Sequence, residues 1–370
     1  MPSRILEPGK TVRLRRKLLA WYARNRRELP WRRSSDSYSI WVSEIMLQQT
    51  RVAAVVDRYQ TFMARFPTLV SLALAAEEEV LALWSGLGYY RRARMLHKAA
   101  QFVARRYQGN LPASSAELRL LPGIGVYTAA AIASIAHGEP VAAVDGNVER
   151  VLCRLQGWDA EGSRGGGAVR RKVEALAIEL LDTAHPGDFN QALMELGAIL
   201  CLPRNPLCPA CPVASDCRTQ GEHKRPARPA MERREVAHAL SIRHGAYPQG
   251  GVGSRQREVL LEQRPRGLTV MPDLWELPRA RDAVVPEPEL LMTVRHTVMQ
   301  VNYRVRIRAV VEDEIEGMAI IGGARRWVPL GEAGSMALTG LTRKVLSRAR
   351  LLPATPDDAI AALDKEAATR

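Results

Sequence analysis

The stretch Leu121-Pro-Gly-Ile-Gly-Val-Tyr-Thr-Ala-Ala-Ala-Ile-Ala133 joins two expected helices through a turn that contains two glycines. Ser114 and Glu117 have capping-box spacing, which predicts a short helix before the turn, and the alanine-rich end predicts a helix after it. Gly123 and Gly125 let the backbone approach a phosphate, toward which the second helix directs its free N–H groups. An ordinary helix–helix turn is the commoner meaning of such a pattern. In a basic chain, however, it predicts a sequence-independent grip on one DNA strand.

Four cysteines follow downstream with the spacing C-x6-C-x2-C-x5-C: Cys201, Cys208, Cys211 and Cys217. Thiolates this close in sequence can converge on one metal centre, and both zinc and an iron–sulfur cluster accept four of them. A disulfide pair is disfavoured because nothing in the chain indicates secretion. Cys153, the one cysteine outside the group, is expected in the core. The spacing by itself leaves zinc and an iron–sulfur cluster open.

The composition indicates a polyanionic partner. The 370 residues include 53 Lys and Arg against 39 Asp and Glu, which gives a net charge of +14. This length suits two or three domains, and charge alone does not choose between DNA, RNA and a membrane surface. No apolar run is long enough to cross a bilayer and no secretory signal opens the chain. We therefore expect a cytoplasmic protein without a membrane partner.

The periodicity of apolar residues changes near residue 218. Before this point they recur at helical spacing, and after it they alternate with the period of half-buried strands. We predict helices over 43–66, 69–84, 92–107, 169–183 and 190–201, strands over 235–244, 258–263, 301–310 and 326–328, and a last helix over 339–348. A polar, proline-bearing stretch separates the two patterns and is typical of a linker. The chain is therefore expected to contain a mostly α part followed by an α+β part.

Two carboxylates have the surroundings that acid–base chemistry needs. Glu44 is flanked by apolar residues on an expected helix, where desolvation would raise its pKa and keep it protonated as a general acid. Asp145 precedes another expected helix, where a carboxylate kept ionised can face a developing cation. The plainer alternatives are an exposed glutamate and a simple helix N-cap. Two carboxylates in contrasting environments are typical of glycosidic bond cleavage.

Several motifs occur in a characteristic order: Leu29-Pro-Trp-Arg32, Glu44-Ile-Met-Leu-Gln-Gln-Thr50, Gly86-Leu-Gly-Tyr-Tyr90, Leu121-Pro-Gly-Ile-Gly-Val-Tyr127, Val144-Asp-Gly-Asn-Val148 and the four cysteines. In this order the chain resembles the helix-hairpin-helix DNA glycosylases and, among them, the MutY-type adenine DNA glycosylases. The resemblance covers nearly all of 14–217. The segment from Leu260 to Pro278 also resembles the Nudix-like recognition domain of that family.

The resemblance implies the architecture. It implies a helical catalytic region at 1–220, with a six-helix barrel and a cluster subdomain whose four cysteines hold a 4Fe–4S cluster. A linker at 221–234, a Nudix-like lesion-recognition domain at 235–352 and a tail at 353–370 would follow. The partner implied is double-stranded DNA with an adenine opposite 8-oxoguanine or guanine, bound by a monomer.

The resemblance also implies the reaction, which is hydrolysis of the N-glycosidic bond of the mispaired adenine. Catalytic roles fall on Glu44, Asp145, Tyr127 and Asn147. Substrate or DNA contacts fall on Trp31, Arg32, Gln48, Tyr89, Gly123, Gly125, Gln191, Thr297 and Gln300. The related endonuclease III group has a lysine where this chain has Tyr127, and a tyrosine cannot form the imine of a strand-cleaving lyase. The alternatives are an endonuclease III-like glycosylase, a thymine-mismatch glycosylase and a mismatch-binding protein without chemistry.

The sequence departs from the family at one place. Val298-Met299-Gln300 stands where relatives carry Phe-Ser-His, and Met299 cannot reproduce the hydrogen bonds of a hydroxyl. We therefore expect weaker discrimination between 8-oxoguanine:A and G:A, or a contact supplied by water or by Gln300. The glutamate-rich Nudix box that binds Mg²⁺ is also missing, so nucleotide hydrolysis is not expected.

Overall fold

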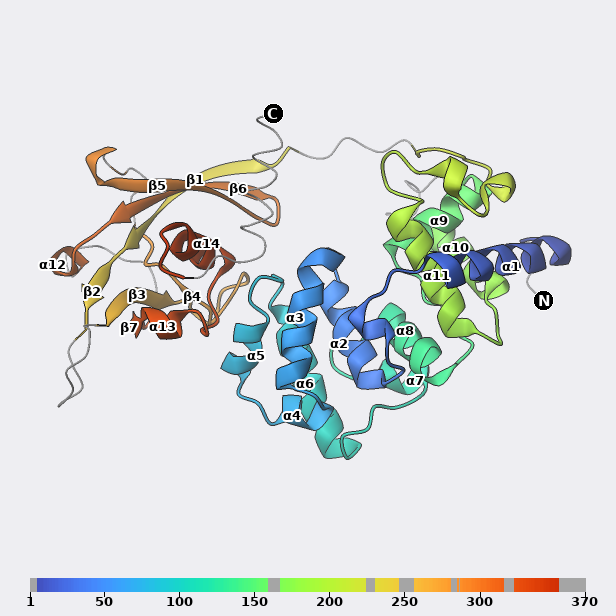
Figure 1. Cartoon of the computed structure of the whole chain (residues 1–370), viewed down its shortest axis with the longest axis horizontal. Coiled ribbons are helices and arrows are strands. Elements are labelled where there is room, and N and C mark those ends of the chain that lie inside the picture. The colour runs from blue at the N-terminus through green and yellow to red at the C-terminus, as the bar shows by residue number, and fades with distance from the viewer. Residues whose placement is uncertain are drawn as a thin grey trace. The chain divides into compact units, whose positions relative to one another are not determined.

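The computed structural model describes residues 5–158, 167–223, 230–245, 256–280, 285, 287–315 and 323–352. It divides into two compact units (Figure 1). Unit 1 comprises Met1–Leu74 and Met95–Arg228, and unit 2 comprises Ala75–Arg94 and Pro229–Arg370. The expected tail at 353–370 and part of the expected linker lie outside the described residues.

Unit 1 is built from helices, with 3-10 turns at Pro30–Arg32, Cys208–Ala210 and Ala214–Asp216. Its helices are α1 (Pro8–Asn25), α2 (Ser37–Leu47), α3 (Val52–Arg65), α4 (Leu69–Ala73), α7 (Ser115–Leu118), α8 (Val126–His137), α9 (Gly146–Gln156), α10 (Gly167–Leu180) and α11 (Pro186–Ile199), and α6 (Arg91–Arg106) runs into it from unit 2. The mostly α expectation for this part of the chain is confirmed.

The helix predicted over 43–66 is wrong in one respect, because the chain breaks between α2 and α3. Gln49 adopts a positive φ of 55°, and Thr50 donates its N–H to the Leu47 carbonyl in a tight turn. A helix does not pass through a residue in this left-handed conformation. The break places Gln48, Gln49 and Thr50 in the lining of a pocket instead of on a continuous helix face.

The hairpin between α7 and α8 requires a glycine at position 123. Gly123 has a φ of +79°, and a Cβ there would lie 2.8 Å from the Cβ of Met95. The expected capping box is only half formed. Ser114 accepts the Glu117 N–H at 3.3 Å, but the Glu117 carboxylate takes the Ser114 hydroxyl at 2.6 Å instead of a backbone N–H.

Unit 2 contains two sheets, which confirms the α+β expectation. One sheet has the order β1-β6-β5 and the other β2-β3-β4, with β7 paired to β3. The strands are β1 (Glu232–Leu240), β2 (Ile242–His244), β3 (Arg257–Gln263), β4 (Trp275–Glu276), β5 (Leu290–Val298), β6 (Val301–Ala309) and β7 (Arg325–Pro329), and the helices are α5 (Glu77–Leu83), α12 (Glu312–Ile315), α13 (Leu330–Ala333) and α14 (Gly340–Arg348).

The strand predicted over 235–244 is in fact two strands. β1 runs parallel to β6, with Val236 opposite Val305, whereas β2 pairs antiparallel with β3, with Ile242 opposite Val259. The buried Ser241 separates them and accepts the Leu260 N–H at 3.1 Å. One continuous apolar pattern therefore serves two sheets, because the chain changes sheets at a corner.

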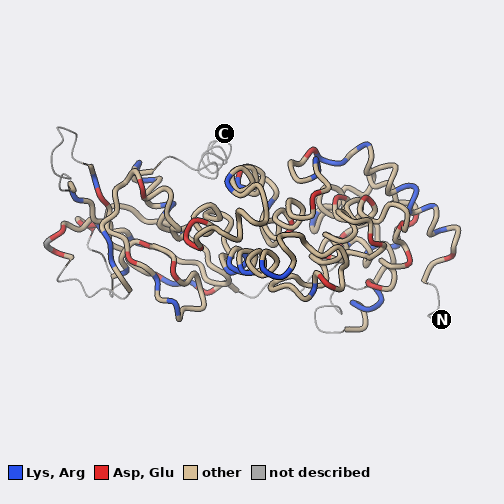
Figure 2. Tube along the Cα trace, turned by 90° about the horizontal axis from the view of Figure 1, so that it is seen from below, with Lys and Arg blue, Asp and Glu red and all other residues tan. Residues whose placement is uncertain are grey.

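Apolar residues from both sheets and from α14 fill the core of unit 2, among them Val259, Val294, Val305 and Val345. Charged residues are distributed along both units, with Lys and Arg interspersed among Asp and Glu (Figure 2). The basic excess is therefore not confined to one tail or to one run of sequence.

Candidate active site

A pocket of about 960 Å³ in unit 1 collects most of the residues that the sequence singled out. It is lined by α2, α8, α9, α11 and the turn at Pro30–Arg32. The predicted residues that line it are Trp31, Arg32, Glu44, Gln48, Gly123, Gly125, Tyr127, Asp145, Asn147 and Gln191.

Glu44 is held inside the pocket wall by α2. Its side chain is buried, with 8 % of the residue exposed, and its Oε2 accepts a hydrogen bond from the Tyr127 hydroxyl at 2.8 Å. Burial raises the pKa of Glu44 from 4.5 to about 7, and the nearby Asp145 adds to this rise. The Tyr127 hydrogen bond and the Arg32 charge oppose it. Glu44 can therefore carry a proton near neutral pH.

Tyr127 is a neutral hydrogen-bond donor beside that carboxyl. Burial raises its pKa well above 10, and the charges of Glu44 and Asp145 raise it further. The hydroxyl also contacts the Met194 sulfur at 3.5 Å. Because the phenol stays protonated, it orients Glu44 without competing as an acid.

Asp145 is the N-cap of α9. Its Oδ1 accepts the Val148 N–H at 2.7 Å, and its Oδ2 accepts the Asn147 side-chain amide at 3.0 Å. Burial raises the pKa of Asp145 above its usual range, and these hydrogen bonds and the Arg150 charge oppose this rise without cancelling it. The helix N-terminus and the amide thus favour the charged form of a carboxylate that desolvation disfavours.

Arg27 and Glu195 line the same pocket, and sequence reasoning missed both. Glu195 is 1 % exposed and accepts bonds from Arg27 Nε at 2.8 Å and from Arg32 Nη2 at 2.8 Å. Burial acts to raise the pKa of Glu195, but the hydrogen bonds from Arg27 and Arg32 outweigh it and lower the pKa to about 2. The signal in the sequence that could have identified Glu195 is its position as a charged residue within the apolar run of α11.

Arg150 connects the Asp145 end of α9 to the cysteine loop. It donates to the Asn147 side-chain oxygen at 2.9 Å, to the Gly197 carbonyl at 2.7 Å and to the Cys201 carbonyl at 2.9 Å. Asn147 in turn donates to Asp145. The orientation of the Asp145 carboxylate therefore depends on the position of the loop that begins at Cys201.

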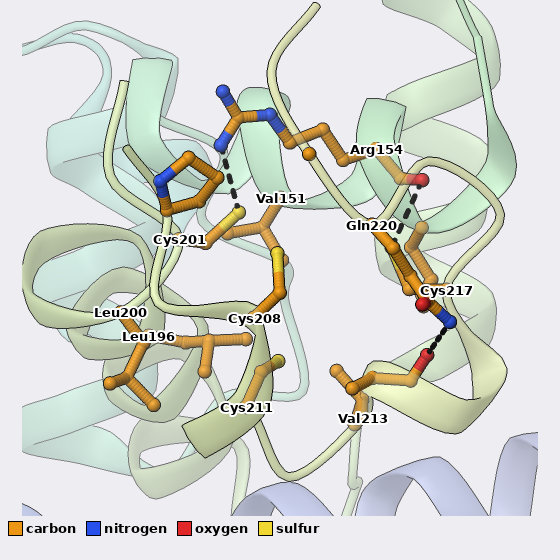
Figure 3. A pocket seen from close by; sticks show the side chains of 14 residues that line it. Val151, Arg154, Leu196, Leu200, Cys201, Cys208, Cys211, Val213, Cys217 and Gln220 are labelled. Carbon is orange, nitrogen blue, oxygen red and sulfur yellow. Dashed lines mark hydrogen bonds between the residues drawn. The ribbon is translucent and has the colours of Figure 1, made fainter. Parts of the chain in front are cut away.

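Cys201, Cys208, Cys211 and Cys217 line one cavity of unit 1 (Figure 3). All four are free thiols. Burial is the main cause that raises the pKa of Cys211 to about 11, and the nearby Cys201, Cys208 and Cys217 add to this rise. A single zinc ion needs sulfurs about 2.3 Å from the metal. Within the described residues, no group of three or more His, Cys, Asp or Glu side chains is placed to hold one ion. Four thiols around one cavity are a donor set that could hold a thiolate-bound metal centre.

The remaining predicted residues lie in unit 2. Tyr89 is 52 % exposed. Thr297 and Gln300 lie at the β5–β6 hairpin, where Val298 pairs with Val301 and Thr297 donates its hydroxyl to the Asn302 side chain at 2.7 Å. Met299 is 73 % exposed at the tip, with a φ of +54°.

The chain is similar to known DNA repair proteins, although it spans less than half the length of several curated relatives that it matches. Residues 42–176 match the family model of the HhH-GPD superfamily base excision DNA repair proteins. The human adenine DNA glycosylase is 50 % identical over 212 residues, which cover 55 % of this chain and 38 % of the human protein. The adenine DNA glycosylase of Buchnera aphidicola subsp. Schizaphis graminum is 38 % identical over 205 residues, which cover 54 % of this chain and 57 % of the relative.

Solved structures resemble the fold of the chain. A thermostable thymine-DNA glycosylase superposes with a TM-score of 0.53 at 29 % identity, covering 57 % of this chain and 97 % of that one. An endonuclease III–DNA covalent intermediate superposes with a TM-score of 0.50 at 24 % identity, covering 58 % and 98 % of the two chains. No helix in the described part of the chain is long and apolar enough to span a membrane.

Proposed function

We propose that this chain hydrolyses the N-glycosidic bond of adenine mispaired with 8-oxoguanine or guanine, because residues 42–176 match the family model of the HhH-GPD superfamily base excision DNA repair proteins. The observation that carries the proposal is the shared pocket. It places Glu44, with a pKa of about 7, beside Asp145, which accepts hydrogen bonds from the start of a helix. Glycosidic cleavage with a cationic sugar needs this combination.

The reaction begins with extrusion of the adenosine from the duplex, which is easiest at a mispair. The Arg32–Glu195 pair offers a fixed set of donors and acceptors to the extruded base, and Trp31 offers a flat apolar surface. Gln191 lies in the same wall. We assign adenine recognition to these residues.

Glu44 donates its proton toward N7 of the base, which makes adenine a better leaving group. As the bond breaks, positive charge develops on the sugar, and the Asp145 carboxylate stabilises it before water completes hydrolysis. Asn147 and Tyr127 hold the two carboxyl groups in place. Without a lysine at position 127 there is no amine for a Schiff base, so the enzyme is monofunctional.

We assign a 4Fe–4S cluster to Cys201, Cys208, Cys211 and Cys217. When bound, the cluster supplies structural cross-linking of the loop through four thiolate bonds. Through Arg150 the loop then fixes Asn147 and, with it, Asp145. The hairpin at Gly123 and Gly125 and the N-terminus of α8 are proposed to bind DNA phosphates, and Gln48 and Tyr89 to fill the space left in the stack.

We propose that the sheets of unit 2 form a Nudix-like domain that reads the base opposite adenine, with Thr297 and Gln300 at its β5–β6 hairpin. The whole chain is proposed to act as a cytoplasmic monomer on double-stranded DNA.

The test of this function is base excision from an 8-oxoguanine:A duplex, followed by alkali. Strand cleavage at the adenine that requires alkali is expected. Cleavage without alkali would point to a lyase. Excision of thymine from a G:T duplex, with no excision from the 8-oxoguanine:A duplex, would point to a thymine-mismatch enzyme. Tight binding without excision would point to a sensor.

Replacing Cys211 with serine is expected to lower bound iron and sulfide together, because one ligand of the cluster is lost. The purified wild-type protein should contain iron and acid-labile sulfide, with little zinc. Metal analysis measures the iron and zinc, and a sulfide assay measures the sulfide. Cys153→Ser serves as the matched control, since Cys153 is buried in the core and is not among the residues that line the cavity. Stoichiometric zinc in the wild type would contradict the assignment.

Gln300→Ala is expected to reduce the preference for 8-oxoguanine:A over G:A by about tenfold, the effect of one lost hydrogen bond. The preference is measured as a ratio of kcat/KM values. Met299→Ala, at the neighbouring exposed position of the same turn, should leave the ratio unchanged. Full preference in Gln300→Ala would remove Gln300 from lesion recognition.

Glu195→Gln is expected to weaken substrate binding more than it slows the chemical step. The change weakens the bonds from Arg27 and Arg32, which are proposed to face the base. Single-turnover kinetics at varied enzyme concentration separate the two effects. A fall in the rate constant at saturation with unchanged binding would assign Glu195 to the chemical step instead.

A further inference from the structure

The loop Gly86–Tyr90 belongs to unit 2, although the sequence places it among the helices of the catalytic region. Its ends are bonded to the chain before α14. The Tyr90 hydroxyl donates to the Leu338 carbonyl at 2.9 Å, and the Ser85 hydroxyl lies 3.5 Å from the same carbonyl. Ser85 is 0 % exposed and Tyr90 is 4 % exposed. These bonds are therefore shielded from water.

Arg343 on α14 completes this cluster. Its Nε donates to the Ser85 hydroxyl at 2.9 Å, and its Nη2 donates to the Gly334 carbonyl at 3.1 Å. We call Ser85, Tyr90, Leu338 and Arg343 the latch. A buried hydrogen-bonding group that loses its partner is destabilising, so the latch favours the conformation in which the loop is bonded to the chain around α14.

A second attachment involves Arg94 of α6, the helix that follows the loop. The Arg94 guanidinium donates to the Pro272 carbonyl at 2.8 Å and to the Glu77 carboxylate at 2.9 Å. The loop is thus bonded to two separate segments of the C-terminal sequence, both within unit 2. These bonds reach residues more than 170 positions downstream in the sequence.

The conformation that is held is an unusual one. Tyr89 has a φ of +47°, a region that side-chain-bearing residues rarely adopt, and it persists only where the surroundings enforce it. Trp84 Nε1 donates to the Gly88 carbonyl at 3.1 Å, and Arg92 donates to the Leu87 carbonyl at 3.0 Å. The Arg92 guanidinium also lies 5.3 Å from the centre of the Tyr89 ring.

We propose that Ser85, Tyr90 and Arg343 are positioning residues for Tyr89. Through them, the part of unit 2 around α14 sets the conformation in which the half-exposed Tyr89 ring is presented for stacking. This rests on the proposed function, which supplies the stacking partner as the bases beside the mispair. The latch makes the ring a preorganised wedge, which inserts without first ordering its loop.

Hydrogen exchange tests the latch independently of any activity. In the full chain, the backbone amides of residues 85–92 should exchange about tenfold faster than wild type in Tyr90→Phe, the effect of losing one buried hydrogen bond. They should exchange at least as fast in Arg343→Met, which removes the bonds to Ser85 and to Gly334. Lys344→Met is the matched control, since Lys344 is the next residue of α14 and donates to the Arg295 carbonyl. Thermal midpoints show whether the variants fold. Unchanged exchange in both folded latch variants would overturn the proposal.

A double-mutant cycle tests whether the latch acts through Tyr89. Tyr90→Phe should slow base extrusion, followed with a fluorescent base beside the mispair, by about tenfold in the wild type. In a Tyr89→Ala background it should change the rate less than about twofold, because the ring it positions is gone. Equal slowing in both backgrounds would make the latch merely structural. If no adenine is excised but the exchange result holds, the proposed function fails and the latch stands.

Discussion

Glu44→Gln is expected to lower the single-turnover rate constant of adenine excision by about 10³-fold, within the range for loss of a general acid. Glutamine keeps the size of the side chain and can still accept the Tyr127 hydroxyl, which donates to Glu44 at 2.8 Å. It cannot, however, supply a proton to the base. The measurement is excision from an 8-oxoguanine:A duplex with enzyme in excess.

The stability of the same variant provides the control. The Glu44 pKa rises from 4.5 to about 7 on folding, so the folded state binds the proton more tightly. The contribution of Glu44 to stability is therefore complete below pH 4.5 and is lost as the pH rises through about 7. Glu44→Gln should accordingly be at least as stable as wild type at pH 8. Excision at the wild-type rate in this variant would remove Glu44 from the mechanism.

Asp145→Asn is expected to lower the rate constant by a similar factor, about 10³-fold, because the charge that faces the cationic sugar is removed. Asparagine is as good an N-cap as aspartate, so α9 should keep its start and the chain its thermal midpoint. The comparison of Asp145→Asn with Asp145→Ala then separates charge from capping.

Asp145→Ala should lose the same activity and, in addition, about 1 kcal/mol of stability from the missing cap. Substrate binding by both variants, measured as a dissociation constant, should change far less than the rate constant. A wild-type rate constant in Asp145→Asn, with lost activity only in the alanine variant, would mean that Asp145 is a cap and nothing more.

The sequence was most informative where a function is local. Asp145 shows its cap position in the residues that follow it, and Glu44 shows its apolar surroundings in its own helix. Strands such as β6 (Val301–Ala309) also follow from alternating segments of the sequence. In these cases the neighbours along the chain are the neighbours in space.

Other features depend on partners that are remote in sequence. The Arg27–Glu195 pair spans 168 positions, and no pattern near either residue identifies the other. The latch likewise joins Ser85 to Arg343 across 258 positions. The break at Gln49 was missed for a different reason, because the apolar spacing continues through a left-handed residue that only the backbone conformation reveals.

The pH dependence of the single-turnover rate constant is the most direct test of Glu44 as the acid. With a pKa of about 7, Glu44 is protonated below that pH and loses its proton above it. The rate constant should be level on the acidic side of pH 7 and fall about tenfold per pH unit on the alkaline side. In Glu44→Gln the residual rate should show no such fall. An alkaline limb near pH 7 that persists unchanged in Glu44→Gln would contradict the account.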